Sequence, residues 1–165
     1  MISEERLIEL QEFIVMPRGV YTYLHNTERK ENAEDIMLNG FHFEGYLDYT
    51  TDQISGIELI ELKYFFHQRG RYGRYTVILQ IAQALINKYS AMASDSRIHF
   101  SEILSQSAAL NAESGETTYI LPPQFTRGYF DQDKGKIFEN NLFNPALDLE
   151  VFNDNVKFLK QNKQK

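Results

Sequence analysis

The sequence of 165 residues contains no cysteine and no tryptophan, and it has only four prolines. The lack of cysteine excludes disulfide bonds and metal sites built on thiolates. No apolar run approaches the roughly 18–20 residues that a transmembrane helix requires. The amino terminus, Met-Ile-Ser-Glu-Glu-Arg, has neither the basic start nor the apolar run of a secretory signal. We therefore expect a soluble, cytoplasmic protein with no membrane attachment, or an effector delivered by a route that needs no signal.

Several common catalytic motifs are also absent. There is no Gly-x-Gly-x-x-Gly or Walker A sequence for binding phosphates, and no Gly-x-Ser-x-Gly sequence for a nucleophilic serine. The four histidines, His25, His42, His67 and His99, are scattered and have no companions at the spacing of a zinc site. A metalloenzyme, a kinase and an α/β-hydrolase are therefore poorly supported, and we expect no metal.

The composition is that of one folded domain. Hydrophobic residues make up 42% of the chain, and the aromatic share consists of 12 phenylalanines and 10 tyrosines. A chain of this length can remove about 70% of its unfolded surface from water. The formal net charge of −6 argues against a protein that wraps nucleic acid, because phosphate neutralisation requires clustered lysine and arginine.

The apolar spacing predicts a mixture of helices and strands. Helices are predicted over residues 3–15, 31–38, 55–68 and 147–159, and residues 83–112 look mainly helical with a break at 94–96. Strands are predicted over residues 20–25, 75–82, 118–121 and 125–130, with the second of these central because it is almost continuously apolar. Residues 41–51 are expected to be extended and rich in turns. The chain therefore predicts a single α+β domain over residues 1–165, with a polar tail at about 160–165.

The strand over residues 20–25 ends in a pattern with chemical meaning, Tyr23-x-His25-x-Thr27. The helix that follows contains Asn32-Ala33 and ends at Gly40-Phe41. A histidine at a strand end presents a ring nitrogen that can bond a ribose hydroxyl, and the hydroxyl of Thr27 can help to hold an amide. This arrangement resembles the first signature of the ADP-ribosyltransferase superfamily, in which such a strand meets the nicotinamide riboside half of NAD.

A second segment, Glu116-Thr-Thr118-Tyr-Ile-Leu-Pro-Pro, resembles the last signature of that superfamily. There the pattern often reads Glu-x-Glu, three apolar residues and two prolines, and the second acid stabilises the cationic ribose as nicotinamide departs. Thr118 stands at the position of that second acid, which makes this chain a divergent member of the pattern. Three explanations follow: Glu116 is catalytic in a shifted register, Glu113 reaches in from the loop, or the domain no longer transfers ADP-ribose.

Two further segments fit a pocket for NAD. Tyr49, in Asp-Tyr-Thr-Thr-Asp, lies where the resemblance implies a stacking or bracing residue, and Tyr46 is a competitor for that place. The run from Arg69 to Tyr75 contains three arginines, Arg69, Arg71 and Arg74, whose guanidinium groups suit phosphate. In a simple turn, these arginines would instead pair with the surplus carboxylates.

The resemblance implies a split, mostly antiparallel β-sheet flanked by helices, with NAD as a substrate and no metal. Under it, Glu116 and His25 are the catalytic candidates, and NAD is bound by Tyr23, His25, Thr27, Tyr49, Arg69, Arg71 and Arg74. The implied activity is transfer of one ADP-ribose unit to a protein or nucleic-acid acceptor, in a toxin, a defence protein or a housekeeping modifier. The alternatives are an inactive module of the same fold, which binds a nucleotide, nucleic acid or protein, and an unrelated α+β protein. The motifs identify neither the acceptor nor the oligomeric state.

Overall fold

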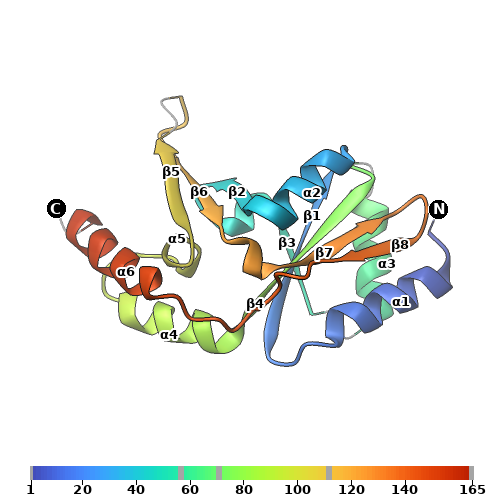
Figure 1. Ribbon diagram of the computed structural model, residues 1–165, viewed down its shortest axis with the longest axis horizontal. Helices are drawn as coiled ribbons and strands as arrows, with labels where there is room; N and C mark the ends of the chain where they lie inside the picture. Colours follow the sequence, from blue (N-terminus) through green and yellow to red (C-terminus); the bar gives the residue numbers. More distant parts are fainter. Residues whose placement is uncertain (1, 56–57, 70–71, 111–112, 164–165) are drawn as a thin grey trace.

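The computed structural model describes residues 2–55, 58–69, 72–110 and 113–163. Its first sheet has five strands in the order β3-β1-β4-β7-β8, with each neighbouring pair antiparallel. The strands of this sheet are β1 (Val20–Thr27), β3 (Asp52–Ile54), β4 (Tyr75–Ala82), β7 (Thr126–Asp131) and β8 (Lys136–Glu139). The central strand β4 pairs with β1 along its whole length, so these two long strands form the middle of the sheet (Figure 1).

The second sheet has three antiparallel strands in the order β2-β6-β5. It consists of β2 (Phe41–Glu44), β5 (Gln106–Leu110) and β6 (Thr117–Leu121). It stands beside the first sheet and not in line with it (Figure 1). The structure is therefore α+β with two antiparallel sheets, which confirms the predicted α+β class.

Six α-helices and two short 3-10 helices, η1 and η3, lie in the described part of the chain. They are α1 (Glu4–Val15), α2 (Lys30–Asn39), η1 (Leu47–Tyr49), α3 (Leu59–Arg69), α4 (Gln83–Ala93), α5 (Phe100–Ile103), η3 (Pro123–Phe125) and α6 (Glu150–Lys163). Helix α1 begins as its sequence suggests, because the Ser3 side chain accepts a hydrogen bond from the Arg6 amide and Glu4 and Glu5 occupy the first turn.

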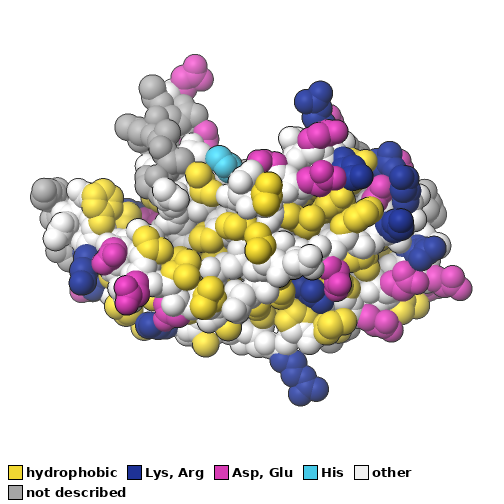
Figure 2. Space-filling view, in the orientation of Figure 1, with side chains coloured by type: hydrophobic (Ala, Val, Ile, Leu, Met, Phe, Trp, Pro, Cys, Tyr) yellow, Lys and Arg dark blue, Asp and Glu magenta, His cyan; other side chains and the backbone are white. Residues whose placement is uncertain are grey.

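The two faces of β1 and β4 contact different cores. On one face, α1 and α3 pack their apolar side chains against Leu24, Ile78 and Phe130. On the other face, Tyr23 and Leu79 belong to a larger core that includes α2, α4, α6 and the inner face of the second sheet. Every residue of β4 is buried, which is why the strand carries so few polar side chains. On the face shown in Figure 2, apolar side chains form a broken band across the middle of the molecule.

Most predicted elements are present, and three differences have a physical reason. The prediction of helix over residues 83–112 is wrong beyond α5, because residues 106–110 form an edge strand of the second sheet. Their sequence, Gln-Ser-Ala-Ala-Leu, favours helix locally, and pairing with β6 overrides that preference. Strands β3 and β8 were not predicted, because strands of three and four residues show almost no periodicity.

Within the described ranges, no helix combines the length and the apolar character that crossing a bilayer would demand.

Candidate functional site

His25 lies near the end of β1, opposite Val77 of β4 and one residue beyond the last pair that β1 makes with β3. Its Nδ1 atom lies 2.8 Å from the carbonyl oxygen of Thr50. Since a carbonyl oxygen can only accept, Nδ1 carries the proton and donates, and the neutral ring offers Nε2 as an acceptor. The ring also packs edge-on against Phe41, with centroids 4.8 Å apart. Protein contacts therefore fix both the orientation and the tautomer of this histidine.

Burial lowers the pKa of His25 below its ordinary value, and the hydrogen bond to the Thr50 carbonyl opposes part of that shift. The neutral form is therefore the one favoured at neutral pH. A neutral imidazole with Nε2 as acceptor is suited to receiving a hydroxyl proton in a hydrogen bond.

A cleft of about 320 Å³ opens beside His25. Its walls come from the end of β1, from the turn around η1, from Phe65 of α3 and from Tyr72. Tyr49 lines this cleft and is 62% exposed, so its ring is accessible to a ligand. Two of the residues predicted to bind NAD, His25 and Tyr49, therefore face the same hollow.

Tyr23 and Thr27 do not line this cleft. Tyr23 is 2% exposed in the larger core, and burial together with the nearby charge of Asp48 raises the pKa of its hydroxyl. The Thr27 hydroxyl accepts a hydrogen bond of 3.0 Å from the side-chain amide of Asn32 in α2. The spacing Tyr23-x-His25-x-Thr27 thus anchors β1 to the core and to the following helix, with only His25 reaching the cleft.

Glu116 does not line the His25 cleft, but its carboxylate and one edge of the Tyr49 ring both lie next to Gly45. A Cβ atom placed on Gly45 would lie 2.6 Å from Cε2 of Tyr49 and 2.7 Å from Oε2 of Glu116. The backbone of Gly45 has φ of +69°, in the left-handed region that favours glycine. Its amide also donates to the carbonyl of Thr117, which ties this turn to the start of β6. Gly45 therefore allows the Tyr49 ring and the Glu116 carboxylate to approach the same point.

Like Glu116, neither Thr118 nor Glu113 lines the His25 cleft. Thr118 pairs with Glu44, whereas its neighbour Tyr119 pairs with Phe43 on the face that joins the core. Thr118 therefore projects from the opposite face of the second sheet, and it does not line the His25 cleft. Glu113 is exposed in the loop before β6 and does not line it either. The ring of Tyr46 packs against His99 and Tyr49, which makes Tyr46 a support for Tyr49.

The arginine-rich turn contributes Tyr72 to the cleft, and the guanidinium group of Arg74 is already paired with carboxylates. Arg74 donates to Asp131 through Nε at 2.9 Å and Nη2 at 3.1 Å, and Nε also lies 3.3 Å from Asp133. The side chain of Arg69 and the whole of Arg71 lie outside the described residues. Gly73 lies directly against the backbone of Thr27, since a Cβ atom there would come within 2.4 Å of it. This contact holds the turn beside β1 and lets Tyr72 reach the cleft.

The sequence pointed to Thr50 and Thr51 only as part of the hydroxyl run around Tyr49, and in the structure both residues organise the cleft. Thr50 binds His25 through its backbone carbonyl, and the Thr51 hydroxyl donates to the carbonyl of Leu47 at 2.9 Å. Backbone acceptors carry no side-chain signature, so only the run of hydroxyl residues around Tyr49 could have pointed to this turn.

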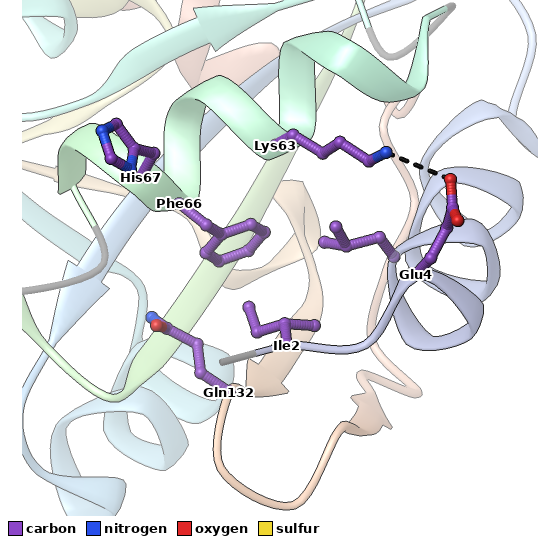
Figure 3. Close-up of a pocket in the computed structure, with 7 residues that line it drawn as sticks. Ile2, Glu4, Lys63, Phe66, His67 and Gln132 are labelled. Carbon is purple, nitrogen blue, oxygen red and sulfur yellow. Dashed lines mark hydrogen bonds and ion pairs between the residues drawn. The ribbon is translucent and has the colours of Figure 1, made fainter.

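A more voluminous hollow, of about 530 Å³, lies elsewhere, between α1, α3 and the β7–β8 turn (Figure 3). Apolar side chains of Ile2, Leu7 and Phe66 form its walls, and an exposed ion pair between Lys63 and Glu4 closes one side. The amide nitrogen of Gln132 donates to the carbonyl of Gly73 and to Thr76. None of the residues predicted to act on NAD lies there, and its polar groups do not form a catalytic arrangement.

The described residues contain no cluster of three or more histidine, aspartate or glutamate side chains that could hold a metal ion. Comparisons with protein-family models, with curated proteins and with solved structures found no match.

Proposed function

We propose that the His25 cleft binds the nicotinamide end of NAD, and that the protein transfers a single ADP-ribose unit to a protein or nucleic-acid acceptor. One observation carries this proposal: His25 and Tyr49 face one cleft, and the carboxylate of Glu116 lies beside the Tyr49 ring at Gly45. These three residues are far apart in the sequence, and they are among those for which the resemblance implies roles in NAD chemistry.

Each residue has a distinct role in the proposed reaction. His25 Nε2 accepts a hydrogen bond from a ribose hydroxyl, and the Tyr49 ring stacks on nicotinamide. The bond between the ribose carbon and the nicotinamide nitrogen breaks, and its electron pair leaves with nicotinamide. The Glu116 carboxylate opposes the positive charge that develops on the ribose. The acceptor then bonds to that carbon and releases its proton.

Arg74 has no role in the proposed reaction, because its guanidinium group is held by Asp131. Phosphate binding by this turn would have to come from Arg69 or Arg71. The exposed ring of Tyr72, at the edge of the cleft, is placed to pack against the rest of the dinucleotide.

The test is cleavage of NAD by the purified full-length chain, measured by release of nicotinamide, together with labelling of candidate acceptors. Glu116→Gln should reduce turnover by about 100- to 1,000-fold, the range for losing one group that stabilises transition-state charge. Glu113→Gln is the matched control, because it removes the same charge from the same loop. If Glu113→Gln abolishes turnover and Glu116→Gln does not, the catalytic role of Glu116 is wrong.

The same experiment separates the second candidate, an inactive module that binds NAD. Its support is Thr118, which stands where the resemblance implies a carboxylate. Such a module would bind NAD without releasing nicotinamide, and His25→Ala would weaken binding. In a thermal shift assay, NAD at a hundred times its dissociation constant stabilises by about 2.7 kcal/mol. The lack of any shift with NAD, ADP-ribose or nicotinamide would contradict both candidates.

A further inference from the structure

A second, smaller pocket of about 240 Å³ lies between α6, α5 and β6, apart from the residues that line the His25 cleft. Two polar side chains in its wall, Glu102 and Ser105, are each 3% exposed. Neither Oε2 of Glu102 nor Oγ of Ser105 has a hydrogen-bond partner among the described residues. Buried polar atoms are nearly always paired in folded proteins, so two unpaired atoms on residues of one pocket wall are evidence of a missing partner. Each atom has almost no accessible surface, so a ligand reaches them by displacing neighbouring side chains of the wall.

The surroundings of these two atoms are held in place from α6. Lys163 donates to the other oxygen of Glu102 at 2.7 Å, and Asn155 donates to the carbonyls of Ile103 and Ser105 at 2.8 and 2.7 Å. Burial raises the pKa of Glu102, and Lys163 opposes that shift. The Glu102–Lys163 pair brings no net charge to the pocket, so this wall does not select strongly for an ion.

The shape and chemistry of the pocket restrict what can fill it. An ionised Glu102 can only accept a hydrogen bond, whereas the Ser105 hydroxyl can donate one. The Ser105 amide donates to the Glu102 carbonyl at 3.4 Å, so the two residues lie on one turn and a complementary ligand carries a donor and an acceptor on one edge. Phe158 and Leu159 provide an apolar wall, and Phe158 is 60% exposed although it lines the pocket. A flat ring lying on Phe158 would cover that exposed surface.

We propose that this pocket is a second binding site, which takes a small planar group with an N–H donor next to an acceptor. The N–H group donates to Oε2 of Glu102, and the Ser105 hydroxyl donates to the neighbouring acceptor. A primary carboxamide and the amino edge of adenine both present this pattern. The site does not depend on the proposed reaction at His25, and either proposal can fail without the other.

The test uses two probes, nicotinamide for the carboxamide and adenosine for the base, titrated into the full-length protein with backbone amide NMR as the readout. At least one of them should shift the signals of residues 102–105 and 155–159, with a millimolar or tighter dissociation constant. N,N-dimethylnicotinamide and N6,N6-dimethyladenosine lack the N–H donor, and they should not bind there. Comparing the dissociation constants of nicotinamide and adenosine shows whether the pocket prefers a carboxamide or an adenine base.

Three variants complete the test. Ser105→Ala should weaken probe binding about tenfold, as expected for losing one hydrogen bond in a buried site. Phe158→Ala should weaken it to a similar extent, whereas Val151→Ala, which removes another exposed apolar side chain of α6, should not. His25→Ala separates the two sites, because it should leave these shifts unchanged.

Two outcomes would overturn the proposal. One is a lack of shifts at residues 102–105 with either probe up to its solubility limit, which would assign the pocket to water alone. The other is binding that Ser105→Ala leaves at full strength. We expect Ser105→Ala to fold, because it removes a buried hydroxyl that has no partner among the described residues.

Discussion

The His25 cleft and the pocket beside α6 differ in how their polar groups are satisfied. In the cleft, the His25 ring and the Thr51 hydroxyl both bind backbone carbonyls of the η1 turn. In the pocket, Glu102 and Ser105 each retain a buried atom without a partner among the described residues. The first hollow is a surface whose geometry the protein fixes by itself. The second has unused hydrogen-bonding capacity, and the protein pays a free-energy penalty for it that a ligand would remove.

The largest expected effect concerns Gly45, on which the geometry of the cleft depends. Gly45→Ala should destabilise the fold by about 1–2 kcal/mol, because its φ of +69° is unfavourable for a residue with a Cβ atom. The new methyl group should also displace the Tyr49 ring and the Glu116 carboxylate. Under the proposed function, NAD turnover should therefore fall by tenfold or more, measured by nicotinamide release.

Gly115→Ala is the matched control for this effect. Gly115 has φ of +74°, and a Cβ atom there would meet no atom within 4 Å. The two variants should lose similar stability in chemical denaturation, and only Gly45→Ala should lose activity. Equal activity in the two variants would show that the contact of Tyr49 and Glu116 at Gly45 is irrelevant to function.

A hydroxyl that has a partner should behave in the opposite way to one that does not. Thr51→Val keeps the shape of the side chain and removes the hydrogen bond to the carbonyl of Leu47. The free energy of unfolding should fall by about 1 kcal/mol, since Thr51 is buried and the carbonyl loses a partner. Urea denaturation of the wild type and the variant measures this difference.

Ser105→Ala should stabilise the ligand-free protein, by about 0.5–1 kcal/mol, because it removes a buried hydroxyl that has no partner. The same denaturation experiment measures it. A loss of stability instead would mean that the hydroxyl already has a partner, such as a bound water, and the contrast between the two hollows would disappear.

The smallest expected effect is the pH dependence that His25 contributes. Its pKa in the folded protein is lowered by burial, so the unfolded chain takes up a proton at higher pH than the folded protein does. The stabilisation from this group is present above the unfolded value of about 6.5 and is lost as the pH falls through the lower folded pKa. Unfolding free energies measured between pH 7.5 and 5 should fall less in His25→Gln than in the wild type.

The sequence could predict the elements that have a strong local pattern. Strands β1 and β4 were predicted because alternation or continuous apolar content marks them, and His25 stood out because it ends such a strand. Strand β5 could not be predicted, because its alanine-rich sequence favours helix until β6 pairs with it. The Glu102 pocket could not be predicted either, since it exists only because Asn155 and Lys163 bring α6 across from about 50–60 residues away.

The strand order of the two sheets has a consequence for how the molecule folds. Strand β2 lies in the chain between β1 and β4, and β5 and β6 lie between β4 and β7, although they belong to the other sheet. A cut at any point between Glu44 and Gln106 would leave strands of both sheets on each fragment. Neither sheet can therefore form from one continuous stretch of chain. Such interleaving favours a single cooperative unfolding transition, with slow folding because most of the strand pairs join distant segments.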